Sequence, residues 1–383
     1  MRIAAPARTC GAIPLIARAR SLVLRFGASA NSYQILNPGI EHWFSEAGDA
    51  VVGYAQHSGF RVVAGAPVCA AERLGPVLGE FESEAKRRGL RVCYFCVESE
   101  FADRHSRSPQ HSLVRLGAQP CWDPARWEET LEGHPSMRAQ LRRARNKRVV
   151  VRERIGDATP RLEMKICLNQ WLATRGAPPM HFLVEPETLG LLEDRRTFVA
   201  EQSDPNAPSD GSRKVLAFLV ASPIPGRNGW LVEQIVRGEG AVNGTTELLL
   251  DAAMRALAAD GASFVTLGLS PLSSRGDIVR DSTPLWLRLL LGWLRAHGRR
   301  FYNFEGLEAF KSKLRPNGWD PVYAVIEGPT VSSRALYAIA GAFTAGHPLS
   351  ATLRALAWAV RREFGLIRRR VSNLRRRQQF PKK

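Results

Sequence analysis

The chain has 383 residues, of which 45% are hydrophobic and 23% are charged. This composition excludes a disordered chain, because it can bury a sizeable core, and the length favours two domains or one large one. The net charge of +18 predicts an anionic partner, and composition alone leaves nucleic acid and an acidic membrane surface equally open.

Residues 1–30 are predicted to form a basic N-terminal arm. The first 26 residues contain five arginines and no acid, and they lack an apolar core followed by a cleavage site. A secretory signal is therefore not expected, and a basic surface helix or an unstructured arm fits better. No stretch of the chain reaches the roughly 18 uncharged apolar residues of a membrane-spanning helix, because the most apolar one, 285–294, contains Arg288.

Residues 31–150 are predicted to form a first lobe. The expected elements are a short helix-loop entry at 33–44, a β-hairpin at 49–55 and 60–66, a helix at 70–88, a buried strand at 92–98, a helix at 111–117 and a strand at 118–122. This alternation of strands and helices is typical of α/β folds.

A basic helix at 136–148, capped by Ser136, is expected to close this lobe. It carries Arg138, Arg142, Arg143, Arg145, Lys147 and Arg148, and no acid lies within the run. A solvated helix face and a face that contacts an anion both fit this pattern.

The six cysteines do not indicate a metal or redox site. Cys93 and Cys96 form a C-x-x-C pair inside a predicted strand, where residues three apart point to opposite faces. Buried free thiols, and with them a reducing, cytoplasmic setting, are expected.

Residues 151–330 are predicted to form a second lobe that repeats the order of the first. The expected elements are helices at 161–174 and 185–194, strands at 197–202, 214–222 and 229–237, a helix at 245–259 and a strand at 264–268. Two units of hairpin, helix and strand indicate a duplicated fold.

Residues 301–323 are the most informative stretch. Alternating aromatic residues lead into a short helical segment with Lys311 and Lys313, and a strand is expected at 322–326. Two lysines beside aromatic residues suit a pocket for a phosphate or carboxylate, because an anion can approach an ammonium from many directions. A solvated helix with an aromatic core face remains the alternative.

Residues 331–383 are predicted to form a basic, helical tail. The part from 361 on holds eight arginines and two lysines against one glutamate, so it supplies about half of the net charge of the chain. Apolar residues recur there at near-helical spacing. A solvated tail and an amphipathic helix on anionic lipid both fit, and deletion of 361–383 should weaken binding to anionic vesicles if the second holds.

Three segments together resemble the C-terminal catalytic domain of phosphatidylglycerol lysyltransferases, the DUF2156 family. They are FYNFEGLEAFKSKLRP at 301–316, LGLSPLSSRG at 267–276, and Asn243-Gly244 with Glu247 at the start of a helix. The basic helix at 136–148 resembles the helix that links the family's two lobes. The resemblance covers about 32–326.

The resemblance implies an α/β fold of two fused acetyltransferase-like (GNAT) lobes with mixed central sheets, the second carrying the active site. It implies transfer of an aminoacyl group from aminoacyl-tRNA to a hydroxyl of an anionic phospholipid such as phosphatidylglycerol, without a metal or other cofactor. A cytoplasmic protein at the inner face of the membrane is then expected. Many members carry an amino-terminal membrane-spanning flippase domain, which this sequence does not contain.

The family's Asp-x-x-Arg pattern is altered here. It reads Gln234-Ile-Val-Arg237, with Glu233 beside the glutamine. A glutamine amide cannot supply the charge with which a carboxylate binds an α-ammonium, and Glu233 points to the other strand face unless a bulge intervenes. The aminoacyl specificity is therefore expected to differ from that of the lysyl enzymes.

The resemblance also implies roles for individual residues. Arg237 is expected to bind a phosphate or the terminal ribose, or else to form a structural ion pair with Glu233 or Glu239. Glu247 is expected to bind the amino group or assist proton transfer, or else to act as a favourable charge at a helix N-terminus. The expected substrate-binding residues are Tyr302, Asn303, Lys311, Lys313, Asn243, Ser270 and Ser273.

Two other functions remain open from the sequence. The loop Arg237-Gly-Glu-Gly240-Ala-Val242 is a weak match to the pyrophosphate loop of acyl-CoA-dependent N-acyltransferases. A lipid- or RNA-binding module without activity is the other alternative, and Gln234 is its best support.

Overall fold

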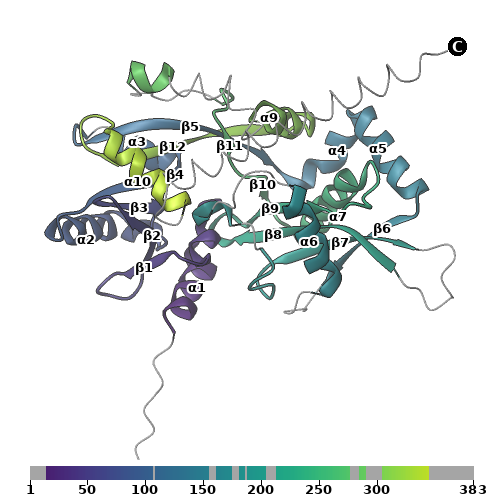
Figure 1. Ribbon diagram of the computed structural model, residues 1–383, viewed down its shortest axis with the longest axis horizontal. Coiled ribbons are helices and arrows are strands. Elements are labelled where there is room, and N and C mark those ends of the chain that lie inside the picture. The colour runs from purple at the N-terminus through teal and green to yellow at the C-terminus, as the bar shows by residue number, and fades with distance from the viewer. Residues whose placement is uncertain are drawn as a thin grey trace, which may run out of the picture.

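The computed structural model describes residues 14–106, 108–154, 161–174, 181–185, 188–203, 213–276, 284–289 and 304–344. These residues form a mixed α/β fold around one twelve-stranded sheet, with helices on both of its faces (Figure 1). The order of the strands across the sheet is β1-β2-β3-β4-β12-β5-β10-β9-β8-β7-β6, and β11 pairs with β5. The α/β class expected from the sequence is confirmed.

The first lobe contains the strands at one end of the sheet. Its strands are β1 (Glu41–Phe44), β2 (Val51–His57), β3 (Phe60–Ala64) and β4 (Arg91–Glu98), and its helical segments are α1 (Leu15–Phe26), η1 (Ser32–Leu36), η2 (Ala71–Arg73), α2 (Leu74–Arg87) and α3 (Ser99–Ser106). Successive residues of β3 and β4 enter different cores, because side chains alternate across a strand: Val62 and Cys93 belong to one, Val63 and Tyr94 to the other.

The second lobe repeats this plan. It contains β6 (Val149–Arg154), α6 (Leu162–Thr174), η4 (Phe182–Val184), β7 (Arg196–Ser203), β8 (Arg213–Ile224), η5 (Pro225–Arg227), β9 (Gly229–Arg237), α7 (Thr245–Ala259), β10 (Phe264–Thr266) and β11 (Ser270–Pro271). In each lobe an antiparallel hairpin is followed by a helix and then a strand parallel to the second hairpin strand, as β2-β3-α2-β4 and β8-β9-α7-β10. The predicted repeat is confirmed.

The two lobes share strands at the centre of the sheet. β5 (His111–Trp122) follows the first lobe in sequence but pairs with β10 of the second. β12 (Gly318–Glu327) follows the second lobe but lies between β4 and β5. The predicted second lobe, 151–330, contains β12, whereas its partners β4 and β5 lie in the predicted first lobe, 31–150. The predicted division therefore separates β12 from the strands with which it pairs.

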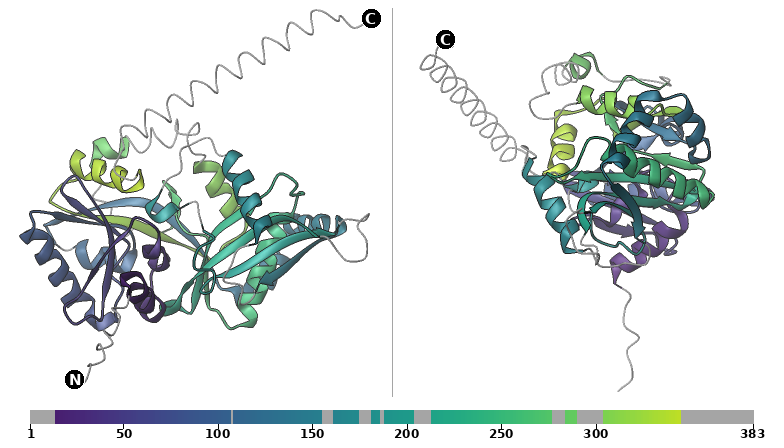
Figure 2. Two further views of the ribbon diagram at one scale, coloured as in Figure 1. Left: turned by 60° about the horizontal axis from the view of Figure 1, so that its bottom comes forward. Right: turned by 90° about the vertical axis from the view of Figure 1, so that its right-hand side faces the viewer.

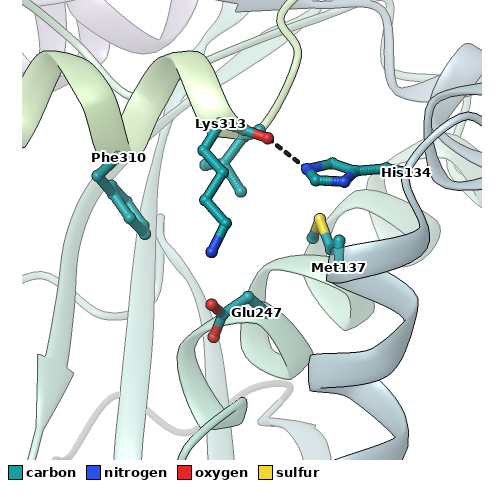
Figure 3. A pocket seen from close by; sticks show the side chains of 6 residues that line it. His134, Met137, Glu247, Phe310 and Lys313 are labelled. Atoms are coloured by element: carbon teal, nitrogen blue, oxygen red, sulfur yellow. Dashed lines mark hydrogen bonds between the residues drawn. The ribbon is translucent and has the colours of Figure 1, made fainter.

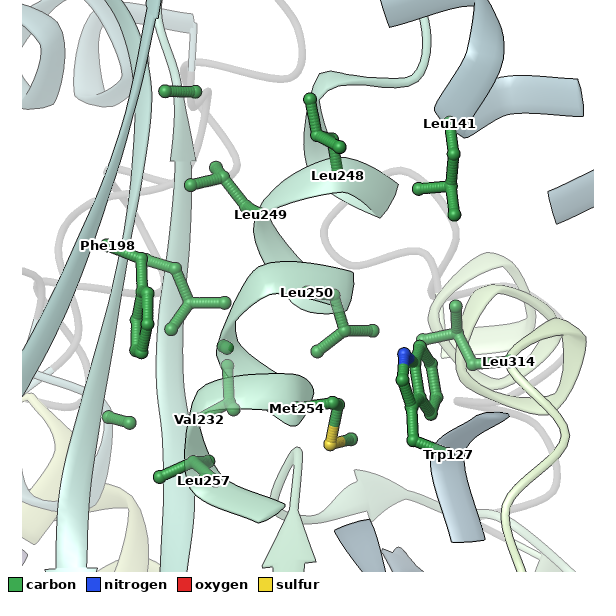
Figure 4. Close-up of a cluster of buried hydrophobic side chains, with 14 of the residues drawn as sticks. Trp127, Leu141, Phe198, Val232, Leu248, Leu249, Leu250, Met254, Leu257 and Leu314 are labelled. Carbon is green, nitrogen blue, oxygen red and sulfur yellow. The ribbon is translucent and has the colours of Figure 1, made fainter. Parts of the chain in front are cut away.

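The remaining helical segments pack mainly against the second lobe. They are η3 (Pro124–Arg126), α4 (Trp127–Glu132), α5 (Pro135–Asn146) and α9 (Phe304–Lys313), whereas α10 (Ser333–Phe343) covers β2 and β3 of the first lobe. The core of the second lobe forms around α7, whose Leu248, Leu249, Leu250, Met254 and Leu257 are buried between the sheet and Trp127 (Figure 4). The predicted bounds of this helix, 245–259, are confirmed.

The prediction of a helix at 111–117 is wrong. These residues form the first half of β5, which pairs with β12 along its whole length. The apolar residues of this stretch fit a strand as well as a helix, and the pairing with a strand 200 residues away decides for the strand.

Two further expectations need correction. The described residues of 185–194 form no helix; the short turn η4 precedes them and β7 follows them. Ser136 does not cap α5, because His134 is the N-cap residue and Pro135 opens the helix.

The ends of the chain are described in part. Within the expected N-terminal arm, α1 is a packed helix whose Ala19 and Val23 are fully buried. Within the expected tail, residues 331–344, which include α10, are described, and the basic run at 361–383 lies outside the described residues. Among the described helices, none is both long and apolar enough to cross a membrane.

The cysteines described by the structure are all free. Cys93 is buried in β4, whereas Cys96 has a φ of +67° at a bulge where β4 pairs with β12. Burial raises the pKa of both thiols to about 12, so neither is a ready nucleophile. Both thiols of the C-x-x-C pair are free, as predicted; Cys93 is buried, whereas Cys96 is partly exposed.

Candidate active site

A small pocket lies where α5, α7 and α9 meet (Figure 3). It is lined by His134, Met137, Glu247, Phe310, Lys313 and Leu314. The ammonium of Lys313 points toward the carboxylate of Glu247, and Phe310 and Met137 provide apolar walls. The pocket thus brings one cation and one carboxylate together between apolar walls.

Hydrogen bonds to the backbone fix α9 over this pocket. His134 Nε2 donates to the carbonyl oxygen of Lys313, and Arg315 donates to the carbonyl oxygen of Gly133. On the other side, Trp122 Nε1 donates to the carbonyl oxygen of Leu314 at 3.2 Å. The bonds to Lys313 and Leu314 satisfy carbonyl groups at the end of α9, and the bond to Gly133 satisfies one at the end of α4, where a helix leaves them without internal partners.

Glu247 reaches the pocket because α7 approaches α5 very closely. Gly244 has a φ of +92°, and a Cβ atom placed on it would lie 2.2 Å from the backbone oxygen of Gln140. Only glycine fits this position. The Asn-Gly-x-x-Glu spacing therefore has a structural cause: the glycine permits the contact, and Glu247 follows in the first turn of the helix.

Lys311 lies deeper than expected. Its side chain is only 4% exposed, and Nζ donates to the carbonyl oxygens of Gly268 at 2.8 Å and Leu269 at 3.0 Å. Burial lowers the pKa of Lys311 to about 7. The expectation that Lys311 holds a phosphate is therefore revised, because its ammonium faces protein carbonyls and holds the LGLS segment against α9.

Ser270 and Ser273 lie beside this contact. Ser270 pairs with Ala118 in the short β11–β5 ladder, and its buried hydroxyl has no hydrogen-bond partner among the described residues. Ser273 is also buried, and its hydroxyl accepts a hydrogen bond from the backbone of Arg275. Neither serine lines the pocket of Figure 3.

Arg237 and Asn243 lie at the surface. Arg237 ends β9 and donates from Nη2 to the carbonyl oxygen of Ala241 at 3.0 Å, which curls the following loop. Asn243 is exposed just before α7. Within the described residues Arg237 forms no ion pair with Glu233 or Glu239, and it does not line the pocket with Lys313.

A bulge in β9 determines where the side chain of Glu233 points. Val232 pairs with Ala221 and Gln234 with Val220, so Glu233 is the extra residue. Its nearly buried carboxylate lies 3.3 Å from Arg195 Nη2 and accepts a hydrogen bond from the Ser222 hydroxyl at 2.6 Å. The bulge that the sequence left open is therefore present, and Arg195 neutralises the carboxylate of Glu233.

Gln234 faces the same segment as Glu233. Its Oε1 accepts a hydrogen bond from Thr188 Oγ1 at 2.5 Å, while Arg195 Nη1 donates to the carbonyl oxygen of Thr188 at 2.6 Å. The segment 188–195 is thus held to the bulge by both side chains. Neither Gln234 nor Glu233 supplies a free negative charge to a substrate amine.

The basic helix expected at 136–148 is observed as α5, and groups on neighbouring helices pair with some of its arginines. Met137, Leu141 and Ala144 face the core, so the arginines face outward. Arg145 pairs with Asp251 of α7 at 3.0 Å, and Arg138 donates to carbonyl oxygens of α4. Arg142, Arg143, Lys147 and Arg148 are exposed.

Tyr302 and Asn303 lie outside the described residues. Among those that are described, no group of three or more His, Cys, Asp or Glu side chains could hold a metal ion.

The sequence was compared with known families and structures. The family described as "Phosphatidylglycerol lysyltransferase, C-terminal" matches residues 20–326, which is most of the chain. The chain belongs to this family. A phosphatidylglycerol lysyltransferase of Bacillus subtilis (strain 168) is 24% identical over 280 residues, which are 72% of this chain and 31% of that protein. The chain thus spans about a third of the length of this curated relative.

Two solved members of the lysyltransferase family share the fold. The DUF2156 C-terminal domain of a protein assigned as a lysylphosphatidylglycerol synthetase from Agrobacterium fabrum has a TM-score of 0.70 and 21% identity, with 86% of this chain and 97% of that one covered. L-PGS from Bacillus licheniformis has a TM-score of 0.69 and 17% identity, with 91% and 98% covered. These matches, with the repeated strand order, confirm the expected fold of two fused acetyltransferase-like lobes.

Sequence reasoning missed several residues of this lysyltransferase-family site. His134 gave no signal except the proline after it, which marks the start of α5. Thr188 lies in the stretch wrongly predicted as a helix, 185–194, and Arg195 directly follows that stretch. Asp251 lies in the middle of α7, where nothing in the sequence connects it with Arg145.

Proposed function

We propose that the chain transfers an aminoacyl group from aminoacyl-tRNA to a hydroxyl of phosphatidylglycerol. The observation that carries this proposal is that two distant motif segments of the family line one pocket, and the third is held against one of them. Lys311 binds the carbonyls of 268–269, Gly244 brings α7 against α5, and Lys313 faces Glu247. Membership of the lysyltransferase family supplies the type of reaction.

The reaction exchanges one ester for another. The oxygen of the lipid hydroxyl attacks the carbonyl carbon of the aminoacyl ester and forms a new C–O bond. The bond between that carbon and the terminal ribose oxygen breaks, and the hydroxyl proton ends on the ribose oxygen. No electrons are gained or lost, so positioning and stabilisation of the developing oxyanion supply the catalysis.

Glu247 is proposed to bind the α-ammonium of the aminoacyl group. It is the carboxylate that faces the pocket, whereas Glu233 is occupied by Arg195 and Gln234 is neutral. Lys313 is proposed to hold a phosphate of the lipid or of the terminal nucleotide. Arg237 is proposed to contact a phosphate or the ribose, because its fork suits a pair of oxygens.

The exposed cations of α5 support a nucleic-acid donor. Arg142, Arg143, Lys147 and Arg148 are exposed on and just after the helix that also supplies Met137 to the pocket, and they suit the phosphate backbone of an RNA end. Aminoacyl-tRNA is accordingly the proposed donor, and the anionic lipid is the proposed acceptor.

The proposal is tested by following a labelled amino acid. The protein is incubated with phosphatidylglycerol vesicles and tRNA charged with one radiolabelled amino acid at a time. Label in the lipid extract supports the proposal. Absence of lipid label for every amino acid would overturn it. In a parallel reaction with radiolabelled acetyl-CoA, transfer of label from acetyl-CoA but from no charged tRNA would assign the chain to the N-acyltransferases instead.

A further inference from the structure

A short helical turn at residues 284–289 exposes three large apolar side chains. Leu285 is 71% exposed, Trp286 47% and Leu289 66%, and we name these three the apolar tip. Leu287 points the other way, is 1% exposed, and packs in the core of the first lobe. The turn is therefore anchored by one leucine while its other apolar side chains remain in water, at a cost in free energy that a partner can remove.

The apolar tip lies at the same end of the molecule as α10 (Figure 2). The core that holds Leu287 is covered by α10 and by η4, which contribute Ala338 and Phe182 to it. Two exposed apolar residues, Val184 of η4 and Tyr337 of α10, lie on these same elements. Exposed apolar surface is thus concentrated on elements that share one core.

The charge around the apolar tip favours a lipid partner. Between Asp281 and Glu305 the sequence has no acid and four arginines, at 288, 295, 299 and 300, within a chain of net charge +18. Anionic lipid head groups attract such a segment. Tryptophan and leucine beside arginine are the side chains that enter the boundary between head groups and acyl chains.

We propose that the apolar tip inserts into the interface of an anionic phospholipid bilayer and docks the chain on it. This inference rests on the proposed function in one respect: an enzyme that acts on a membrane lipid must contact the membrane. It assigns that contact to residues 285, 286 and 289.

The first test is flotation of the full chain with vesicles of phosphatidylcholine, with and without phosphatidylglycerol. The variant Leu285→Asp/Leu289→Asp should lower the bound fraction on anionic vesicles by at least about tenfold. The matched control is Leu162→Asp/Ile166→Asp on α6, because these leucine and isoleucine side chains are also exposed. The control should bind within about twofold of the wild type. Equal losses in both variants, or no loss in the tip variant, would overturn the proposal.

The second test measures insertion. Lipids brominated on the acyl chain quench tryptophans that enter the bilayer, so quenching in the wild type should exceed that in Trp286→Phe. Equal quenching in the two proteins contradicts insertion of the tip. A concentration-dependent dimer that the tip variant abolishes, without any loss of vesicle binding, would assign the surface to a second copy of the chain instead.

A transfer assay separates this proposal from the proposed function. With short-chain phosphatidylglycerol dispersed as monomers, the tip variant should match the wild type, and only transfer to vesicles should fall. Loss on both substrates would contradict a docking role. If the wild type transfers to neither substrate, the proposed function fails, and the flotation and quenching results still decide the role of the tip.

Discussion

Lys311 Nζ lies 2.8 Å from the carbonyl oxygen of Gly268, and this hydrogen bond joins two segments 43 residues apart in the sequence. A second bond, to Leu269 at 3.0 Å, completes the clamp. The sequence suggested that Lys311 meets an anionic substrate, but the ammonium instead fixes the end of β10 against α9. The anion-binding role proposed for this helix therefore belongs to Lys313, whose ammonium faces Glu247.

Substitution of Lys311 should change how stability depends on pH. Its pKa is about 7 in the folded chain against 10.5 as the ordinary value, so the unfolded chain binds more protons between these two pH values. The free energy of unfolding of the wild type should therefore rise with pH in this window, and that of Lys311→Met should lack this increment. From pH 7 to 9 the wild type should gain roughly 2 kcal/mol relative to the variant.

Urea unfolding followed by tryptophan fluorescence measures this difference. Lys86→Met, on the exposed face of α2, is the control and should follow the wild type at every pH. Parallel pH profiles for wild type and Lys311→Met would contradict the buried, weakly basic lysine.

Alanine at Gly244 should destabilise the chain strongly. The new Cβ would meet the Gln140 carbonyl oxygen at 2.2 Å and would also require a positive φ, so a loss of about 3 kcal/mol is expected. Gly261→Ala is the matched control, because Gly261 also has a positive φ but open space around it. It should cost about 1 kcal/mol, the price of the backbone conformation alone. Equal losses measured by urea unfolding would show that the contact between α5 and α7 is unimportant.

Removal of either charge in the pocket should abolish most of the activity. Glu247→Gln and Lys313→Met are each expected to lower transfer of labelled amino acid to lipid by about 100-fold or more, because each removes a proposed substrate contact made by a charged group. Near-UV circular dichroism should match the wild type, and Lys86→Met should keep full activity. A folded Glu247→Gln variant with the wild-type rate would remove Glu247 from the site.

The Arg195–Glu233 pair should behave as a buried ion pair. Arg195→Met leaves the Glu233 carboxylate buried without its cation, so a loss of about 3–5 kcal/mol in the free energy of unfolding is expected. Arg195→Met/Glu233→Met should recover much of this loss, because no unpaired charge remains. Glu233→Met is measured as well. If the loss in the double variant equals the sum of the losses in Arg195→Met and Glu233→Met, the two side chains do not interact.

Some of the site could be predicted from the sequence. The stretch at 245–259 is bounded by Asn-Gly on one side and Asp-Gly on the other and carries a continuous apolar face, so both ends of α7 were predictable from local signals. The Asn-Gly-x-x-Glu and Phe-Lys-x-Lys segments indicated Glu247 and Lys313, which the structure brings together in one pocket.

The rest depended on contacts between distant residues. The assignment of β5 as a strand required its pairing with β12, and the position of Glu233 required the bulge against β8. The burial of Lys311 required the packing of α9 on the loop after β10.

The sequence by itself determined the alternation of elements, the duplicated plan, the family and the excess of positive charge, because these follow from composition and from local patterns. The tertiary structure alone decided which of these charges are paired within the protein. Whether an ammonium or carboxylate remains free depends on the partner that folding places beside it, and for Lys311 and Glu233 that partner lies far away in the chain.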